Sequence, residues 1–163
     1  MDEVAAAAGV GKGTVYRRFK DQAGLALAVL EEKEREFQHA VLRGDPPLGP
    51  AASADKRLHA FMDGLLDLLD AHTELHVLSE TSCRGARYRG GLYGFYRLHV
   101  EILLREILPG RDVVVLADQL LAPLTADLFT HLRDERGIGT QQIRSGIRQI
   151  VRAIVDSAEA AES

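Results

Sequence analysis

Apolar residues recur along this chain at intervals of three and four positions, the spacing that gathers side chains on one face of an α-helix. No segment keeps the alternation of a half-buried strand for more than a few residues. We therefore predict an all-α protein. The predicted helices, with their capping residues, cover 2–8, 12–18, 21–44, 53–71, 74–82, 92–107, 113–136 and 140–158.

Glycine and proline mark the breaks between these helices. Gly9 ends the first short helix, and the segment 45–50 contains three prolines and a glycine, so it cannot continue a helix. This loop is the clearest boundary in the chain, and it separates a head with its connecting helix, residues 1–44, from a larger helical body, residues 51–163.

The connecting helix carries apolar residues at Leu25, Val29, Phe37 and Val41. The charged run 31–36 between them is typical of a solvent-facing surface, with Glu31 and Arg35 spaced as an i,i+4 pair.

The last two helices predict a dimer. Leucines stand four apart through 113–136, and because this spacing resumes unchanged after Pro123, we expect that proline to kink the helix without ending it. These apolar side chains cover more than one face of the helix, and we expect that the body of a single chain cannot bury them all. Gly146 permits close approach of a partner helix. We predict a homodimer through a four-helix bundle, with Leu121, Leu124, Leu128, Ile143, Ile147, Ile150 and Ile154 in the interface.

Composition narrows the class of protein. The 163 residues are 46% apolar and 27% charged, as in a globular protein, and the single Cys83 cannot close an intrachain disulfide. The apolar runs fall far short of the ~20 residues that a bilayer span needs, and residues 1–10 lack the cation of a secretory signal. We expect a cytoplasmic protein without a membrane segment.

The net charge of −4 hides a basic cluster at the N-terminus, formed by Lys12, Arg17, Arg18 and Lys20. Such a cluster can make a small phosphate footprint on nucleic acid. The glycine-rich segment 9–13 is not a nucleotide-binding loop, because its glycines fit neither the P-loop spacing nor the Rossmann spacing.

Candidate metal-binding and catalytic residues are few in the rest of the sequence. His72 and His76 stand four apart without supporting Cys or acidic residues, so we interpret them as surface or pocket-edge residues and predict no metal and no cofactor. Cys83 has no assured base and there is no Gly-x-Ser-x-Gly motif, so we predict no catalytic residues and no enzyme activity.

The segment 8–19 is typical of a helix-turn-helix, in which Gly9 leaves the first helix and Val10 fills the angle between the helices. Its hidden side would comprise Val4, Ala5, Val15 and Phe19, and the opposite side would meet DNA. The run Asp2-Glu3-Val4-Ala5-x-x-Ala8-Gly9-Val10-x-x-Gly13-Thr14-Val15-Tyr16-x-x-Phe19, followed by Gly24-Leu25, resembles the DNA-binding signature of the TetR family of bacterial regulators.

The resemblance implies a homodimeric repressor with a DNA-binding head in residues 1–44 and an effector-binding and dimerisation domain in 51–163. It implies a palindromic double-stranded operator and release from it by a small-molecule effector. Family members carry a further helix before the first one seen here, so the head would be incomplete.

By position, Thr14 and Tyr16 would hold phosphates, and Lys12, Gly13, Val15 and Arg17 would lie nearest the bases. Arg18 and Lys20 complete the predicted DNA-binding set, Lys20 replacing the family's usual Lys at Gln22. Gly11 stands where the family has a Ser that caps the recognition helix.

The resemblance also implies an effector pocket in the body, for which the candidates are Phe61, Met62, Leu65, Leu78, Tyr93, Tyr96 and His99. We favour a solvated loop over an anion site for Arg84, Arg87 and Arg89. The alternative function is a small-molecule-binding or dimeric helical module that no longer binds DNA. Gln22 and the incomplete head favour this alternative, whereas the intact segment 9–19 opposes it.

Overall fold

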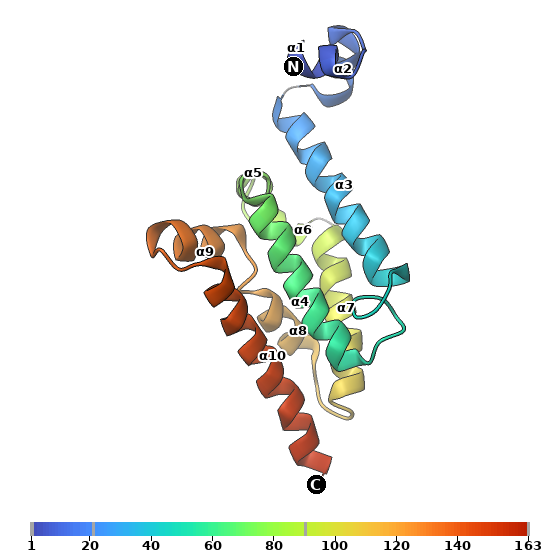
Figure 1. The fold of residues 1–163 in the computed structure, drawn as a ribbon, viewed down its shortest axis with the longest axis vertical. Coiled ribbons are helices and arrows are strands. Elements are labelled where there is room, and N and C mark those ends of the chain that lie inside the picture. The colour runs from blue at the N-terminus through green and yellow to red at the C-terminus, as the bar shows by residue number, and fades with distance from the viewer. Residues whose placement is uncertain (1, 21, 90, 163) are drawn as a thin grey trace.

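The computed structural model describes residues 2–20, 22–89 and 91–162. Every regular element in these ranges is helical, which confirms the all-α prediction (Figure 1). In chain order the elements are α1 (Asp2–Ala7), α2 (Lys12–Phe19), α3 (Gln22–Arg43), α4 (Ala54–Ala71), α5 (Thr73–Thr81), α6 (Ala86–Arg89), α7 (Gly91–Ile107), α8 (Val114–Leu121), α9 (Ala126–Thr130), the π-helical turn η1 (His131–Glu135) and α10 (Thr140–Glu162).

The two short helices α1 and α2 lie at one end of the molecule, at the tip of the long helix α3 (Figure 1). Helix α3 packs on α4 and α5 in the body. Helix α4 is central, in contact with α7 on one side and α10 on another. The C-terminal end of α10 lies at the end of the molecule opposite the head (Figure 1).

The core of the body forms where α4 meets α7. The predicted apolar stripe of α4 is buried throughout, and it comprises Leu58, Phe61, Met62, Leu65, Leu66 and Leu69. Helix α7 faces it with Val100, Leu103 and Leu104, none of which is exposed. Burial of this apolar surface is what holds the helices together, because few of them would be stable alone.

A glycine lets α3 approach α4 closely. The ring of Phe37 lies over Gly64, where an added Cβ would come within 2.5 Å of the Phe37 Cε2 atom. The same ring contacts Phe61 at a centroid distance of 5.6 Å and Tyr96 at 6.2 Å. Phe37 therefore anchors the part of α3 that belongs to the body.

The buried face of α3 differs from the predicted one. Val29 is 45% exposed, whereas Leu30 is 2% exposed and faces the body with Phe37 and Val41. Glu34 stands on this inner face, between Leu30 and Phe37, so the charged run is not wholly solvent-facing.

The ion pairs on the outer face of α3 also differ from the predicted pair of Glu31 and Arg35. Arg35 pairs with Glu32 and Lys33 pairs with Glu36, both with i,i+3 spacing.

The prediction of one kinked helix over 113–136 is wrong, because α8 ends at Leu121 and α9 begins only at Ala126. Pro123 lacks an N–H, and the polar groups freed at the break find partners. The Thr125 side chain accepts from the Leu128 N–H at 3.3 Å as an N-cap. Two long-range bonds complete the break: the Ala126 N–H donates to Glu80 at 3.0 Å, and Arg87 donates to the Leu121 carbonyl at 3.3 Å.

One body buries most, but not all, of the apolar side chains of 113–136. Leu120, Leu121, Leu124 and Phe129 are buried within a single chain, whereas Leu128 is 37% exposed. The short helices α8 and α9 replace the single long one, and their buried side chains join the core of the body.

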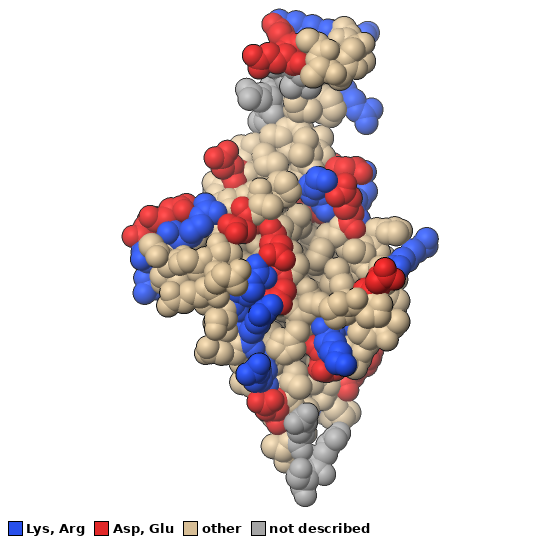
Figure 2. All heavy atoms as spheres, in the orientation of Figure 1, with Lys and Arg blue, Asp and Glu red and all other residues tan. Residues whose placement is uncertain are grey.

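Charged side chains tie α10 to α4. Arg144 and Arg148 of α10 both pair with Asp63 of α4, and Arg144 also pairs with Asp67. Figure 2 shows basic and acidic side chains running together along this face of the body. None of the described helices is long and apolar enough to span a membrane.

Candidate functional site

The head has the backbone geometry of a helix-turn-helix. Gly9 adopts a φ of +64°, which ends α1, and the Val10 N–H donates to the Ala5 carbonyl at 3.0 Å across the turn. Gly11 then takes the extended conformation of an N-cap, with φ −66° and ψ 141°, but it offers no side-chain oxygen to α2. These local features place α2 against α1 with its outer face uncovered.

The predicted hidden side is found for the side chains that the structure describes. Ala5 and Val15 are each 4% exposed, and Phe19 is half-buried. The side chain of Val4 lies outside the described parts of the chain. Because Val15 points into the head, its assignment as a base-contacting side chain is wrong.

The remaining predicted DNA-binding residues are exposed together on α2 and just after it: Lys12, Gly13, Thr14, Tyr16, Arg17, Arg18 and Lys20. Tyr16 is 60% exposed. Nothing lies within 4 Å of where a Cβ on Gly13 would stand, so a phosphate backbone has room to approach there. Figure 2 shows basic side chains along the outer edge of the head.

The contacts that the described part of the head gives to Lys12, Arg17 and Arg18 are exposed or lie at its surface. Lys12 pairs with Asp2 at 2.7 Å, and the Arg17 Nε donates to the Gly13 carbonyl at 3.2 Å. The Arg18 guanidinium lies over the Phe19 ring at 5.7 Å. Exposed pairs of this kind are weak, so a phosphate can displace Asp2 from Lys12. Gln22, which departs from the family pattern, has a side chain outside the described set.

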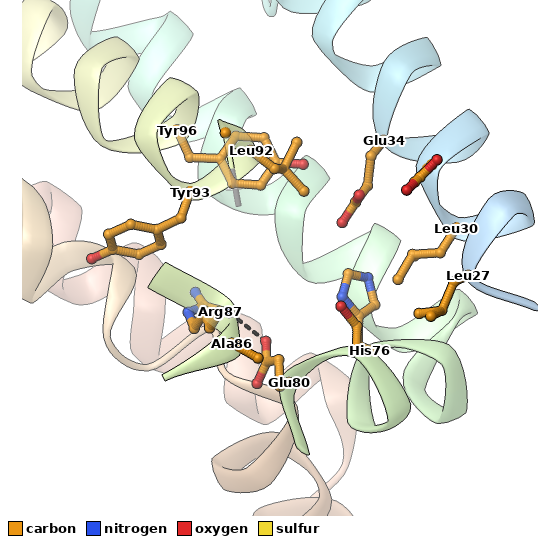
Figure 3. Close-up of a pocket in the computed structure, with 13 residues that line it drawn as sticks. Leu27, Leu30, Glu34, His76, Glu80, Ala86, Arg87, Leu92, Tyr93 and Tyr96 are labelled. Atoms are coloured by element: carbon orange, nitrogen blue, oxygen red, sulfur yellow. Dashed lines mark hydrogen bonds and ion pairs between the residues drawn. The ribbon is translucent and has the colours of Figure 1, made fainter. Parts of the chain in front are cut away.

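A cavity of about 390 Å³ lies in the body (Figure 3). Four helices form its walls: α3 with Leu27, Leu30, Glu31 and Glu34, α5 with His76, Ser79 and Glu80, α6 with Ala86 and Arg87, and α7 with Gly91, Leu92, Tyr93 and Tyr96. The helix that carries the head is thus one wall of the cavity.

Tyr93 and Tyr96 are the two predicted pocket residues that line this cavity. The structure does not bring the other five to it. Phe61, Met62 and Leu65 are buried core residues, and Leu78 lies near the surface at 37% exposure.

The fifth of these residues, His99, is buried at 6% exposure. Its ring contacts the rings of Phe61 and Phe95 at centroid distances of 4.7 and 6.3 Å. Burial lowers the pKa of His99 to about 4, so its imidazole is neutral in this aromatic cluster.

Arg87 is not part of a solvated loop, contrary to the prediction. Its side chain is 17% exposed and pairs with Glu80 at 2.6 Å on the cavity wall. Arg84 and Arg89 are exposed as expected. The Arg87 guanidinium also lies 5.5 Å from the centre of the Tyr93 ring, and the Tyr93 hydroxyl donates to Asp118 at 2.6 Å.

Two buried polar atoms on the cavity wall have no hydrogen-bond partner in the described part of the chain, the Tyr96 hydroxyl and the His76 Nε2 atom. Burial lowers the pKa of His76 to about 4 and raises that of Tyr96, so both groups are neutral at pH 7. Such atoms are rare in proteins because leaving them unpaired is costly, so they mark a place where a ligand can bind.

Glu34 is the third polar group here. Burial, reinforced by the nearby Glu31 carboxylate, raises the pKa of Glu34 to about 7. Figure 3 shows Glu34, His76 and Tyr96 facing the same part of the cavity.

Sequence reasoning placed His76 at a surface or pocket edge but missed the other cavity residues of α5 and all of those on α3. The available signal was Glu34 itself, which stands four residues after Leu30 and three before Phe37, on the inner stripe of the helix. A carboxylate on an apolar stripe is unusual enough to suggest a site. His72 and His76 do not come together with other ligands, since the described residues contain no group of three or more metal-binding side chains.

The predicted dimer-interface residues divide into two sets. Leu121, Leu124, Ile143 and Ile147 are buried in the core of one chain. Leu128 and Ile150 are exposed at 37% and 49%, and Ile154 is half-buried. A partner could therefore contact the exposed set without any change in the body.

Comparison with known proteins identifies the head. Residues 1–29 match the family model described as bacterial regulatory proteins, tetR family. No curated protein and no solved structure matches the chain significantly. The head is thus similar to the N-terminal segment of tetR-family regulators, and this match agrees with the helix-turn-helix geometry of α1 and α2 in an all-α fold.

Proposed function

We propose that this protein is a TetR-type transcriptional repressor that leaves its operator when a small molecule occupies the cavity between α3, α5, α6 and α7. The observation that carries the proposal is the double role of α3. Its C-terminal part is anchored in the body by Phe37, its middle part lines the cavity through Leu30 and Glu34, and its N-terminal end holds the head.

The mechanism is a shift between two positions of the head. A ligand that fits the cavity better when α3 is tilted favours that tilt, and a rigid helix moves its far end the most. Only a ligand with different affinities for the two positions can act in this way, and its effect on DNA binding equals that difference.

In a dimer, the position of each head determines whether both heads can bind the operator at once. Two recognition helices must lie about 34–36 Å apart to enter successive major grooves of a palindromic operator. We propose that the partner contacts the exposed apolar side chains of α9 and α10, including Leu128 and Ile150. A change in the tilt of α3 then alters the spacing of the heads.

The experiment is selection of operator DNA from a random duplex library, followed by affinity measurement with the selected site at increasing salt. A palindrome, and affinity that falls steeply with salt, support the proposal. Tyr16→Ala should weaken binding, whereas Tyr88→Ala, at an equally exposed tyrosine of α6, should not. If no duplex is enriched, the alternative of a helical ligand-binding module without DNA recognition replaces this function.

A further inference from the structure

We propose that the ligand of the cavity is an amphipathic monocation, that is, a small apolar molecule that carries one protonated amine. The inference rests on the proposed function, since it names the chemical class of the effector. The proposal about the ligand is based on three features of the cavity: its charge, the polar atoms on its wall that have no hydrogen-bond partner in the described chain, and the apolar surface beside them.

The cavity carries more negative than positive charge. Arg87 is its one cation among the described residues, and Glu80 neutralises it at 2.6 Å. The carboxylates of Glu31 and Glu34 have no ion-pair or hydrogen-bond partner among the side chains that the structure describes. An anionic ligand would meet these two carboxylates, whereas a cation would offset them.

The unpaired atoms suit an ammonium group. An ammonium has three N–H donors and no acceptor, so it needs acceptors around it. The Glu34 carboxylate and the Tyr96 hydroxyl oxygen can accept, and the neutral His76 ring can accept at Nε2 when its proton is on Nδ1. These three groups come from α3, α7 and α5 and face the same space (Figure 3).

The rest of the cavity wall suits the apolar part of such a ligand. Leu27, Leu30 and Leu92 line the cavity beside the rings of Tyr93 and Tyr96. A volume of about 390 Å³ is within the range of small-molecule sites, which combine an apolar lining with a few convergent polar groups. Aromatic faces also attract cations.

The charge of Glu34 predicts how binding depends on pH. Its pKa of about 7 means that the carboxylate becomes ionised between pH 6 and pH 8, so affinity for a cation should rise over that range. The other titratable or charged groups that face the cavity are Glu31 from α3, His76 and Glu80 from α5, Arg87 from α6, and Tyr93 and Tyr96 from α7. Of these, His76 is already neutral at pH 6, with a pKa of about 4.

The test uses three probes of nearly the same shape, 4-phenylbutylamine, 4-phenylbutanol and 4-phenylbutyrate, titrated into the full chain by calorimetry. We expect the amine to bind at least about tenfold more tightly than the other two at pH 8, and about tenfold more weakly at pH 6 than at pH 8. Glu34→Gln should lower amine affinity about tenfold or more and abolish the pH dependence. Glu36→Gln, two residues further along α3 and exposed, is the matched control and should change neither.

Equal or tighter binding of the alcohol or the carboxylate, undiminished amine affinity in the Glu34→Gln variant, or no binding of the amine each overturns the proposal. Adding each probe to the protein on its selected operator separates this inference from the proposed function. If the amine binds through Glu34 but leaves the operator complex intact, the effector mechanism fails and the ligand class stands. If 4-phenylbutyrate releases the operator instead, the mechanism stands and the ligand class fails.

Discussion

Glu34→Gln should raise the free energy of unfolding relative to the wild type, and this gain should be larger at high pH than at low pH. In the folded chain the pKa of Glu34 is raised from 4.5 to about 7, first by burial and then by the neighbouring Glu31 carboxylate. The folded state therefore holds a proton on Glu34 that the unfolded state has already lost. Stability is lost as the pH rises from about 4.5 to about 7, and the loss is complete above the folded pKa.

The size of the effect follows from that difference in pKa. Each pH unit corresponds to about 1.4 kcal/mol, so the change from 4.5 to about 7 sets an upper limit of about 3 kcal/mol. Glu34 is only partly enclosed, so solvent screens its charge and we expect about 1–2 kcal/mol to remain. Glutamine has nearly the same shape and does not ionise, so it avoids this loss.

The assay is urea unfolding followed by circular dichroism, for the wild type and the variant, at pH 4.5 and pH 8. The quantity of interest is the difference in unfolding free energy between the two proteins, which should grow in favour of the variant by about 1–2 kcal/mol. Glu36→Gln serves as the control, because Glu36 is exposed and its carboxylate pairs with Lys33 at 2.8 Å. A difference that is the same at both pH values, or that shrinks at pH 8, would refute the reasoning.

Three further predictions follow from burial and exposure. Tyr96→Phe should stabilise the chain by about 1 kcal/mol in thermal or urea unfolding, because it removes a buried hydroxyl that has no partner in the described chain; a loss of stability would show that the hydroxyl is bonded. Ile150→Asp should turn the proposed dimer into a folded monomer in analytical ultracentrifugation, whereas Ile147→Asp, at a side chain 5% exposed, should unfold the body; a wild type that sediments as a monomer at micromolar concentration contradicts the proposed dimer. In DNA-binding assays Tyr16→Ala should weaken binding evenly across sequences, whereas Arg17→Ala should also relax base preference by about 1–3 kcal/mol if Arg17 contacts guanine; unchanged binding in both variants contradicts the assignment of α2 as the recognition helix.

The amino-acid sequence by itself determined the helices whose ends depend on nearby residues. Gly9 ends α1 because its positive φ leaves the helical conformation, and the prolines of 45–50 end α3 because they cannot donate the next hydrogen bond. The apolar stripe of α4 was predictable because its spacing matches the helical repeat. The family of the head was also predictable, because its signature lies in one continuous segment, 2–25.

Only the tertiary structure decided what happens at Pro123. The local pattern favours a kink, since apolar spacing continues beyond the proline. The helix ends instead because Glu80 and Arg87, about 40 residues earlier in the chain, bond to the Ala126 N–H and the Leu121 carbonyl. Such partners stabilise a broken helix, and no local pattern reveals them.

The cavity depends on tertiary structure in the same way. Glu34 belongs to a run of charged residues that predicts a solvent-facing surface, and its pKa is raised chiefly because α5, α6 and α7 enclose that side of α3. His76 and Arg87 face the same cavity as Glu34 from separate elements, and they share it only when those elements pack. Sequence spacing within a helix fixes which face a side chain is on, but the packing of the other helices decides whether that face meets water, core or cavity.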